Sequence, residues 1–271
     1  MPSALSAQDI SIAVAAAREA GAAAYALQAS VTATSKSDGS PVTQGDLAAD
    51  AVIRHHLALS FPDDALLSEE SPDGGERLGR RRLWIIDPID GTSDYLRGSG
   101  EWAVQLALAV DGELRLGILD LPAEGICLVG LPGSGAWRLD QHGEHALTVQ
   151  AGGEDILITS QSRRNRAAVE RIHLALPELR LMTAHSVGVK AWRILNGSAG
   201  LYVHPRAIAE WDAAAPAAVL LAAGAAATDL AGAPLRFNTA SGRCPGLVFS
   251  KRSDHAELIA RMAAAGVGLS A

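Results

Sequence analysis

The sequence has few aromatic residues and only two cysteines. Aromatic residues make up 4% of the 271 residues, and Cys127 and Cys244 lie far apart in the chain. Surfaces that stack nucleic-acid bases need exposed aromatic rings, so the low aromatic content disfavours that class of protein. Two isolated cysteines form neither a zinc-binding spacing nor a redox pair. We therefore expect two buried free thiols in a reducing compartment.

The chain also lacks an excess of basic residues and the common nucleotide-binding motifs. Its net charge is -7 at pH 7, which opposes non-specific binding to nucleic acid, because that binding depends on neutralising phosphates with Lys and Arg. It contains no Walker A loop, no Gly-x-Gly-x-x-Gly and no Gly-x-Ser-x-Gly, which disfavours NTPases, dinucleotide enzymes and serine hydrolases. A small phosphorylated substrate stays compatible with this charge if a metal ion supplies positive charge.

Signals for export or membrane insertion are missing as well. Residues 1–5 lack the basic segment and the long apolar run of a signal peptide. Residues 213–227 are apolar and nearly long enough to span a bilayer, but Asp212, Pro216 and many small residues favour a packed helix in a soluble protein. We expect a cytoplasmic protein that binds no membrane.

What is present fits a soluble α/β (α+β) protein, with 48% hydrophobic and 20% charged residues. Hydrophobic periodicity predicts helices over residues 7–28, 46–60, 166–176 and 187–195. It predicts strands over residues 65–68, 83–86, 104–110, 114–119, 125–130, 135–139, 156–159 and 179–183. The pattern changes near Gly152-Gly153, so we expect two closely packed halves, residues 1–152 and 153–271.

The most informative segment runs from Trp84 to Tyr95 and places carboxylates at the end of an apolar strand. Pro88 cannot continue a β-ladder, so we expect the strand to end at Asp87 and a turn to bring Asp87 and Asp90 together. Two close carboxylates repel each other unless a cation lies between them. Oxygen ligands without His or Cys favour Mg²⁺ or Mn²⁺ over Zn²⁺.

The residues after these aspartates are suited to binding a phosphate. Gly91 permits close backbone approach, and Thr92 is favourable for starting a helix. Backbone amides at a helix start bind anions. The alternative is a capped turn, in which Asp90 and Thr92 only satisfy backbone amides.

Two other acidic segments favour the metal interpretation. Glu210-Trp211-Asp212 stands at the front of an apolar helix, and Glu69-Glu70 follows a short strand. Taken singly, the first can be explained as N-capping by Asp212 and the second as a solvated charge pair. Three acidic element ends in one chain point instead to a shared site.

These segments resemble the motifs of the inositol monophosphatase superfamily of Mg²⁺-dependent, lithium-sensitive phosphatases. They occur in order as Ser68-Glu69-Glu70-Ser71, Trp84 through Thr92, and Trp211-Asp212 followed by two alanines. The similarity spans nearly the whole chain. It implies a layered αβαβα sandwich of the sugar phosphatase type, an active site between the halves, two or three Mg²⁺ ions with Mn²⁺ as a substitute, and a homodimer.

The resemblance also implies roles for individual residues. The implied metal ligands are Glu69, Asp87, the Ile89 carbonyl, Asp90 and Asp212. The amides of Gly91 and Thr92 are implied to hold the phosphate. Asp46 matches the acidic residue that pairs with the motif threonine, so Asp46, Thr92 and Glu69 form the implied catalytic group. Thr92 and Asp46 would help to deprotonate a metal-activated water that attacks phosphorus in line.

Residues 186–206 bear on the substrate, which the shared motifs leave open among inositol phosphates, fructose 1,6-bisphosphate and 3'-phosphoadenosine 5'-phosphate. Inositol monophosphatases carry a Glu shortly before the Trp-Asp motif, whereas this chain has His204 there. The segment from Ser186 to Arg193 is similar to a helix start of the bisphosphate nucleotidases that carries a lysine. We therefore expect substrate contacts from Ser186, Lys190, Arg193, His204 and Asp212. The alternatives are a solvated helix face and an ordinary loop histidine.

The resulting hypothesis is a bisphosphate nucleotidase that hydrolyses the 3'-phosphate of 3'-phosphoadenosine 5'-phosphate to AMP, which removes a by-product of sulfate assimilation. The enzyme alternative is an inositol-1-phosphate or fructose-1,6-bisphosphate phosphatase. A non-catalytic sensor that binds metal and nucleotide is the alternative from another class. Asp46 and Thr92 argue against the sensor, because a binding protein does not need a water-activating pair.

Overall fold

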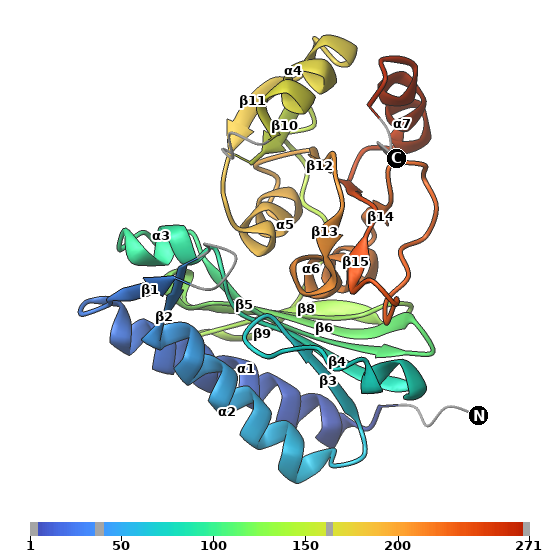
Figure 1. The fold of residues 1–271 in the computed structure, drawn as a ribbon. Helices are drawn as coiled ribbons and strands as arrows, with labels where there is room; N and C mark the ends of the chain where they lie inside the picture. The colour runs from blue at the N-terminus through green and yellow to red at the C-terminus, as the bar shows by residue number, and fades with distance from the viewer. Residues whose placement is uncertain (1–4, 36–40, 161–164, 268–271) are drawn as a thin grey trace.

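The computed structural model describes residues 5–35, 41–160 and 165–267 and has five alternating layers of helices and sheets (Figure 1). The layers are a pair of helices, a seven-stranded sheet, a second pair of helices, a five-stranded sheet and a third pair of helices. The three pairs are α1 (Ala7–Gln28) with α2 (Gln44–Ser60), α5 (Val187–Leu195) with α6 (Glu210–Ala222), and α4 (Arg166–Ala175) with α7 (His255–Ala264). This arrangement confirms the αβαβα expectation.

The seven-stranded sheet has its strands in sequence order. They are β3 (Ala65–Ser68), β4 (Arg82–Asp90), β5 (Ala103–Val110), β6 (Glu113–Leu121), β7 (Ile126–Leu131), β8 (Gly135–Asp140) and β9 (Gly143–Ala146). Only the first pairing in this sheet, β3 with β4, is parallel. Asp111 and Gly112 turn β5 into β6 with positive φ angles of 53° and 79°, as expected of a two-residue hairpin.

Strand β4 differs from the expectation in one important respect, because it continues to Asp90 and does not end at Asp87. Its register with β5 shifts between Asp87 and Asp90, so Pro88 lies at an irregularity where the ladder does not need its missing N–H. The prediction of an ended strand was wrong. The expected closeness of the two aspartates comes from the irregularity instead.

Helices α1 and α2 cover one face of this sheet. The buried face of α1 consists of alanines and a glycine, including Ala13, Ala17, Ala20 and Ala24. Short side chains let α1 approach α2 and the sheet closely. By length and composition α1 is also apolar enough to cross a membrane, a property that core helices of soluble proteins share.

Helix α6 packs against the opposite face of the same sheet. Glycines in β6 and β7 make this approach possible: a Cβ at Gly117 would lie 2.6 Å from the Ala215 carbonyl oxygen, and one at Gly130 would lie 2.5 Å from Val219 Cα. Its residues from Ala213 to Leu220 are buried. The apolar run around residues 213–227 is therefore a packed helix followed by strand β14 (Ala226–Thr228).

The five-stranded sheet has the order β11-β10-β12-β16-β14. Its other members are β10 (Ile156–Thr159), β11 (Arg180–Thr183), β12 (Leu201–His204) and β16 (Leu247–Ser250). A hydrophobic cluster joins its outer face to α4 and α7 through Leu157, Ile172, Val248 and Leu258. The predicted boundary at residues 152 and 153 falls between β9 and β10, although α6 of the second half packs on the sheet of the first half.

Short elements connect the layers and surround the site. They are β1 (Ala33–Ser35), β2 (Pro41–Thr43), η1 (Glu76–Gly79), α3 (Thr92–Leu96), η2 (Pro122–Glu124), β13 (Ile208–Ala209) and β15 (Arg243–Cys244). Strands β1 and β2 form one pair and β13 and β15 another. Cys127 and Cys244 are both buried and free, as the sequence predicted.

Candidate metal and phosphate site

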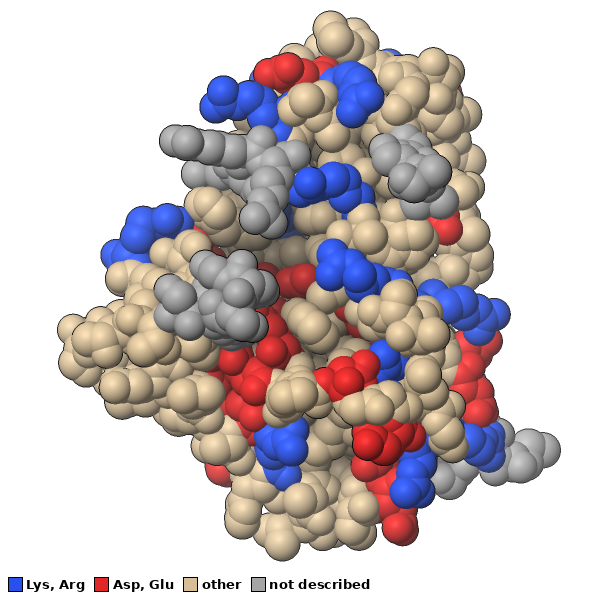
Figure 2. All heavy atoms as spheres, viewed as in Figure 1, with Lys and Arg blue, Asp and Glu red and all other residues tan. Residues whose placement is uncertain are grey.

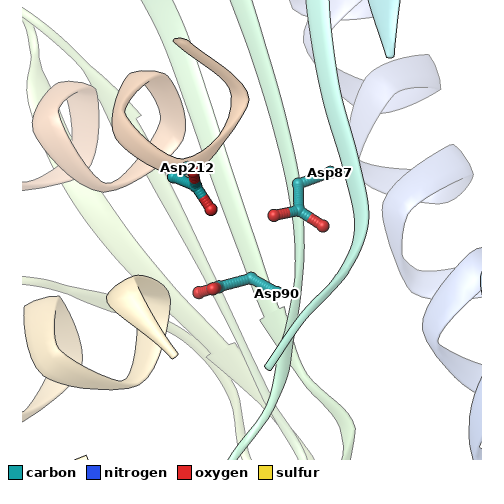
Figure 3. A group of neighbouring side chains, drawn as sticks. All are labelled: Asp87, Asp90 and Asp212. Atoms are coloured by element: carbon teal, nitrogen blue, oxygen red, sulfur yellow. The ribbon is translucent and has the colours of Figure 1, made fainter. Parts of the chain in front are cut away.

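Three aspartates meet where the seven-stranded sheet faces α6. Asp87 and Asp90 come from β4, and Asp212 comes from the first turn of α6 (Figure 3). One oxygen from each carboxylate lies within 4.8 Å of the others, close enough for all three to bind one cation. We call these residues the aspartate triad. Asp87 and Asp90 precede residue 152 in the chain, and Asp212 follows it.

Asp90 is held in place by the start of helix α5. Its Oδ2 accepts hydrogen bonds from Ser186 Oγ at 2.6 Å and from the Gly188 amide at 2.7 Å. Ser186 also caps α5, because its Oγ accepts a bond from the Val189 amide. The cap therefore fixes the orientation of a triad carboxylate, a supporting contact typical of metal sites.

Asp87 has one oxygen in use and one that lacks a partner. Its Oδ1 accepts a hydrogen bond from the Ile89 amide at 3.1 Å, whereas its buried Oδ2 has no hydrogen-bond partner in the described part of the chain. Burial raises the pKa of Asp87 well above its usual value, and Glu69 and Asp90 raise it further. A cation beside Oδ2 would give this buried oxygen a partner and would offset the repulsion from the neighbouring carboxylates. The triad therefore fits a metal ion.

The other two triad carboxylates are also shifted toward their protonated forms. Burial, followed by the charges of Asp90 and Glu69, raises the pKa of Asp212 to about 8. Burial raises the pKa of Asp90 despite the opposing bonds from Ser186 and Gly188. Without a cation, the site therefore retains protons at neutral pH.

Glu69 and the Ile89 carbonyl, the other two expected metal ligands, lie beside the triad. Glu69 follows β3, and its backbone amide donates to the Ile86 carbonyl at 3.2 Å. Its charge raises the pKa values of all three aspartates, although it lies outside the 4.8 Å group. The Ile89 carbonyl accepts a hydrogen bond from Thr92 Oγ1 at 3.1 Å.

Asp46 and Thr92 come together from distant parts of the sequence. Thr92 Oγ1 lies 3.3 Å from Asp46 Oδ1 and 3.1 Å from the Ile89 carbonyl oxygen, so its one hydroxyl proton can be donated to either acceptor. Asp46 Oδ2 accepts bonds from the amide and the hydroxyl of Thr43, and the Thr43 hydroxyl oxygen accepts from the Asp46 amide, which completes a capping box at the start of α2. The buried carboxylate is thereby fixed with one oxygen toward Thr92.

Gly91 joins β4 to α3 in a conformation that favours glycine. Its φ is 98°, and a Cβ there would lie 3.0 Å from the Glu101 carbonyl oxygen and 3.2 Å from Ser186 Cβ. This crowding and the positive φ together favour glycine at the position. Gly91 and Thr92 are both partly exposed to solvent.

A cavity of about 370 Å³ opens beside the triad, a volume within the usual range for small-molecule sites. Acidic and basic residues line it together. In Figure 2, red side chains gather at the central hollow between the two halves and blue side chains border it above. The charged and aromatic lining residues are Glu69, Asp90, His185, Lys190, Tyr202, His204, Arg206, Trp211, Asp212 and Arg243.

Lys190 and His204 line this cavity together with Tyr202. Lys190 Nζ donates to the His185 carbonyl at 2.6 Å and lies 4.8 Å from the centroid of the Tyr202 ring. Burial lowers the pKa of Lys190 to about 8, and the charges of Asp90 and Asp212 oppose that shift. Burial also lowers the pKa of His204 to about 4, so this imidazole is neutral at pH 7.

The two remaining expected substrate contacts, Ser186 and Arg193, are not among the cavity-lining residues. Ser186 is fully buried and supports Asp90. Arg193 lies on another side of α5, with its Nη2 3.5 Å from Glu124 and 3.9 Å from Glu101. The structure therefore brings together Lys190, His204 and Asp212 but not the whole expected set.

Sequence reasoning missed several residues that shape the site. Gly188 holds Asp90 through its amide, and Arg206 and Arg243 add two positive charges to the cavity lining. The Ser-x-Gly spacing at the start of α5 was a signal for the first. Arg243 lies 31 residues beyond Asp212, and only the pairing of β13 with β15 brings it back to the site.

Glu210 belongs to the same acidic segment as Asp212, but its contacts give it a structural role and it is not part of the triad. It is fully buried, and its carboxylate accepts bonds from the amides of Asn238 and Thr239 at 2.8 Å. Asn238 in turn accepts a bond from Arg77 of the first half. Glu210 therefore anchors the loop that leads to Arg243.

Comparisons with known proteins agree with this geometry. The model of the inositol monophosphatase family matches residues 5–266. A protein of Mycobacterium bovis named 3'-phosphoadenosine 5'-phosphate phosphatase is 35% identical over 210 residues, which cover 76% of each chain. The 3'(2'),5'-bisphosphate nucleotidase CysQ of Escherichia coli is 34% identical over 75% of this chain and 82% of its own.

Solved structures show the same fold. An IMPase of Thermotoga maritima superposes with a TM-score of 0.79 and 25% identity, covering 96% of this chain and 98% of its own. CysQ of Bacteroides thetaiotaomicron superposes with a TM-score of 0.75 and 23% identity, covering 91% and 98%. With the family model matching nearly the whole length, the chain belongs to the inositol monophosphatase family.

Proposed function

We propose that this enzyme hydrolyses the 3'-phosphate of 3'-phosphoadenosine 5'-phosphate to give AMP and phosphate. The observation that carries the proposal is the aspartate triad beside a cavity that Lys190, Arg206 and Arg243 also line. The names of the bacterial relatives support the nucleotide substrate, and the basic lining residues suit a second phosphate. Removal of this compound would serve sulfate assimilation.

The proposed cofactor is Mg²⁺, bound as two or three ions, with Mn²⁺ as a substitute. The donor set consists of carboxylates and a carbonyl, the hard oxygen ligands that these ions prefer. Asp87, Asp90 and Asp212 would bind directly, joined by Glu69 and the Ile89 carbonyl. Bound Mg²⁺ would lower the pKa of a water and neutralise charge that develops on the phosphate.

Asp46 and Thr92 are the proposed proton acceptors. With its one hydroxyl proton directed to Asp46 Oδ1 and not to the Ile89 carbonyl, Thr92 Oγ1 would accept a proton from the attacking water as its own proton shifts to Asp46. Thr43 holds the second oxygen of Asp46, which keeps the carboxylate from turning away. Glu69, which lines the cavity beside the triad, is proposed to help to orient the same water.

The proposed phosphate contacts are the amides of Gly91 and Thr92 at the end of β4. Lys190 adds a buried positive charge, and His204 adds a neutral hydrogen-bonding group. Ser186 is assigned an indirect role through Asp90. We leave Arg193 without a substrate contact, because Glu101 and Glu124 hold it outside the cavity lining.

A direct comparison of substrates tests the proposal. We expect faster phosphate release from 3'-phosphoadenosine 5'-phosphate than from inositol 1-phosphate or fructose 1,6-bisphosphate at equal concentrations. A preference for either of the other two would refute the nucleotide assignment and favour the corresponding phosphatase. Inhibition by submillimolar to millimolar Li⁺ is expected in all three cases, so it reports on the metal site alone.

Asp90→Asn separates an enzyme from a non-catalytic nucleotide sensor. The amide oxygen can still accept from Ser186 and Gly188, so the variant should fold, but the lost charge should lower turnover by at least about 100-fold. The thermal unfolding midpoint of the metal-free variant provides the folding control. Unchanged turnover would show that the triad has no catalytic role.

We also propose that the enzyme is a cytoplasmic homodimer, on the basis of the resemblance to the inositol monophosphatase family. Light scattering at several protein concentrations tests the dimer. A constant monomer mass would refute it.

A further inference from the structure

Two arginines of the cavity lining have no assigned role. Arg206 follows β12, and Arg243 stands in β15, which pairs with β13. Both line the same cavity as Asp90 and Asp212. The positions of the two arginines relative to the aspartates therefore decide which part of a substrate each arginine can contact.

The strand pairing gives their placement. Arg243 pairs with Ala209, which lies three residues before Asp212 at the start of α6. Arg206 lies six residues before Asp212, between the end of β12 and the start of β13. Arg243 thus stands beside the segment that enters α6, and Arg206 stands before that segment on the same cavity.

Neither arginine is neutralised by a carboxylate of the described residues. Arg243 Nη2 donates to the Ala207 carbonyl at 2.8 Å, a neutral contact that positions the guanidinium without cancelling its charge. Other arginines of the molecule are paired, such as Arg81 with Asp111 and Arg261 with Glu178. A free pair of guanidinium groups beside a cavity is suited to a phosphate, which accepts two hydrogen bonds from each fork.

The other basic residues of the cavity lining are less available for binding a phosphate. Lys190 is 1% exposed and its Nζ is engaged by the His185 carbonyl and the Tyr202 ring. His204 carries no charge at pH 7. Arg206 and Arg243 are both exposed to solvent, so they can reach an incoming anion without first being uncovered.

We propose that Arg206 and Arg243 bind the second, non-reacting phosphate of a doubly phosphorylated nucleotide and so determine the preference for bisphosphates over monophosphates. This inference rests on the proposed function. The reacting phosphate occupies the aspartate triad, and the second phosphate lies across the sugar from it, at the arginine pair. The pair contributes to substrate affinity and leaves the chemical step to the triad.

The test compares two nucleotides that differ only in the second phosphate, 3'-phosphoadenosine 5'-phosphate and adenosine 3'-monophosphate. Arg206→Ala with Arg243→Ala should raise KM for the bisphosphate by about 10- to 100-fold. The kcat/KM for the monophosphate should change less than about twofold. Replacing both arginines with Lys should recover part of the lost affinity, because charge is kept but the fork geometry is not.

Arg236→Ala is the matched control, because Arg236 is an exposed arginine that pairs with Glu113 and lies outside the cavity lining. It should leave both substrates unaffected. An equal loss for both nucleotides, or no loss for either, would overturn the role of the arginine pair while the nucleotidase function stands. If the wild-type enzyme hydrolyses neither nucleotide, the proposed function falls, and this inference falls with it.

Discussion

At the scale of single residues, the environment of each carboxylate decides its chemistry. The triad aspartates are buried among like charges, and this raises their pKa values. Exposed aspartates such as Asp155 show the opposite shift, because a hydrogen bond from Arg180 lowers the pKa. The same side chain is thus prepared for metal binding at one position and for a surface ion pair at another.

Asp120 of β6 allows this principle to be tested away from the active site. It is buried next to α1, where a Cβ on Gly21 would lie 2.0 Å from its Oδ2. Burial raises its pKa from 3.8 to about 7, with Arg18 opposing. The folded state therefore binds the proton more tightly than the unfolded state, and stability falls as pH rises between these two values.

We expect Asp120→Asn to remove this loss. At pH 8 and saturating Mg²⁺, its free energy of unfolding should exceed that of the wild type by a few kcal/mol, since each unit of pKa shift is worth about 1.4 kcal/mol. At pH 4 the two should be nearly equal. Urea unfolding across this range measures the difference, with the surface variant Asp155→Asn as a control that gains nothing at pH 8. Parallel pH profiles for Asp120→Asn and the wild type would contradict the expectation.

At the scale of secondary-structure elements, most helices and strands follow from the sequence because their periodicity is strong. The bounds of α1 are those expected, and α5 agrees as well. The end of β4 could not be predicted, because whether a proline ends a strand depends on the partner strand. Strand β9 was missed because its four residues are all exposed and carry no hydrophobic pattern.

The candidate site also contains some residues that the sequence predicts and others that it does not. Motifs that are local in sequence, such as Asp87 with Asp90, are enough to predict that these carboxylates share a metal site. Contacts made by the fold, such as Arg243 across β15, have no sequence pattern of their own. Arg193 was expected in the site because it is near Lys190 in sequence, but helical rotation turns it toward Glu124.

The contact of α6 with the sheet gives a test at this scale. Because a Cβ at Gly130 would lie 2.5 Å from Val219 Cα and 3.0 Å from the Ala218 carbonyl oxygen, Gly130→Ala must displace the helix backbone. We expect a loss of about 1–3 kcal/mol in the free energy of unfolding. Gly79→Ala is the control, since a Cβ at Gly79 would meet nothing within 4 Å and the φ of Gly79 is not positive. Equal stability of the two variants by urea unfolding would show that α6 does not need the close approach.

At the scale of the whole molecule, the metal site joins the two halves. Asp87 and Asp90 belong to the first half and Asp212 to the second, and burial of α6 against the first sheet makes one core of both. A cation that binds all three carboxylates therefore stabilises the packing of the halves as well as the site. Binding to the folded state alone raises stability by about 2.7 kcal/mol at a hundredfold excess over Kd.

The stabilisation by Mg²⁺ should depend on pH in a definite direction. Since the folded-state pKa of Asp212 is about 8 and the unfolded value about 3.8, the metal-free protein loses stability as pH rises from 4 to 8. At lower pH a metal must displace protons, so Mg²⁺ should raise the unfolding temperature more at pH 8 than at pH 6. Calorimetry with and without a chelator measures both shifts, and Asp212→Asn should reduce the difference. A shift that is equal at both pH values would contradict this account.

The supported oxygens of the triad have a final consequence for ion selectivity. Asp90 Oδ2 already accepts two hydrogen bonds and Asp87 Oδ1 accepts one, which leaves the other oxygen of each carboxylate better placed for an ion. Ligands that each gave one oxygen would suit a small octahedral cation that keeps several waters. Ca²⁺ prefers six to eight oxygens and often takes both from one carboxylate, so these hydrogen bonds would compete with its binding. We therefore expect the contacts that position these aspartates to favour Mg²⁺ over Ca²⁺ as well.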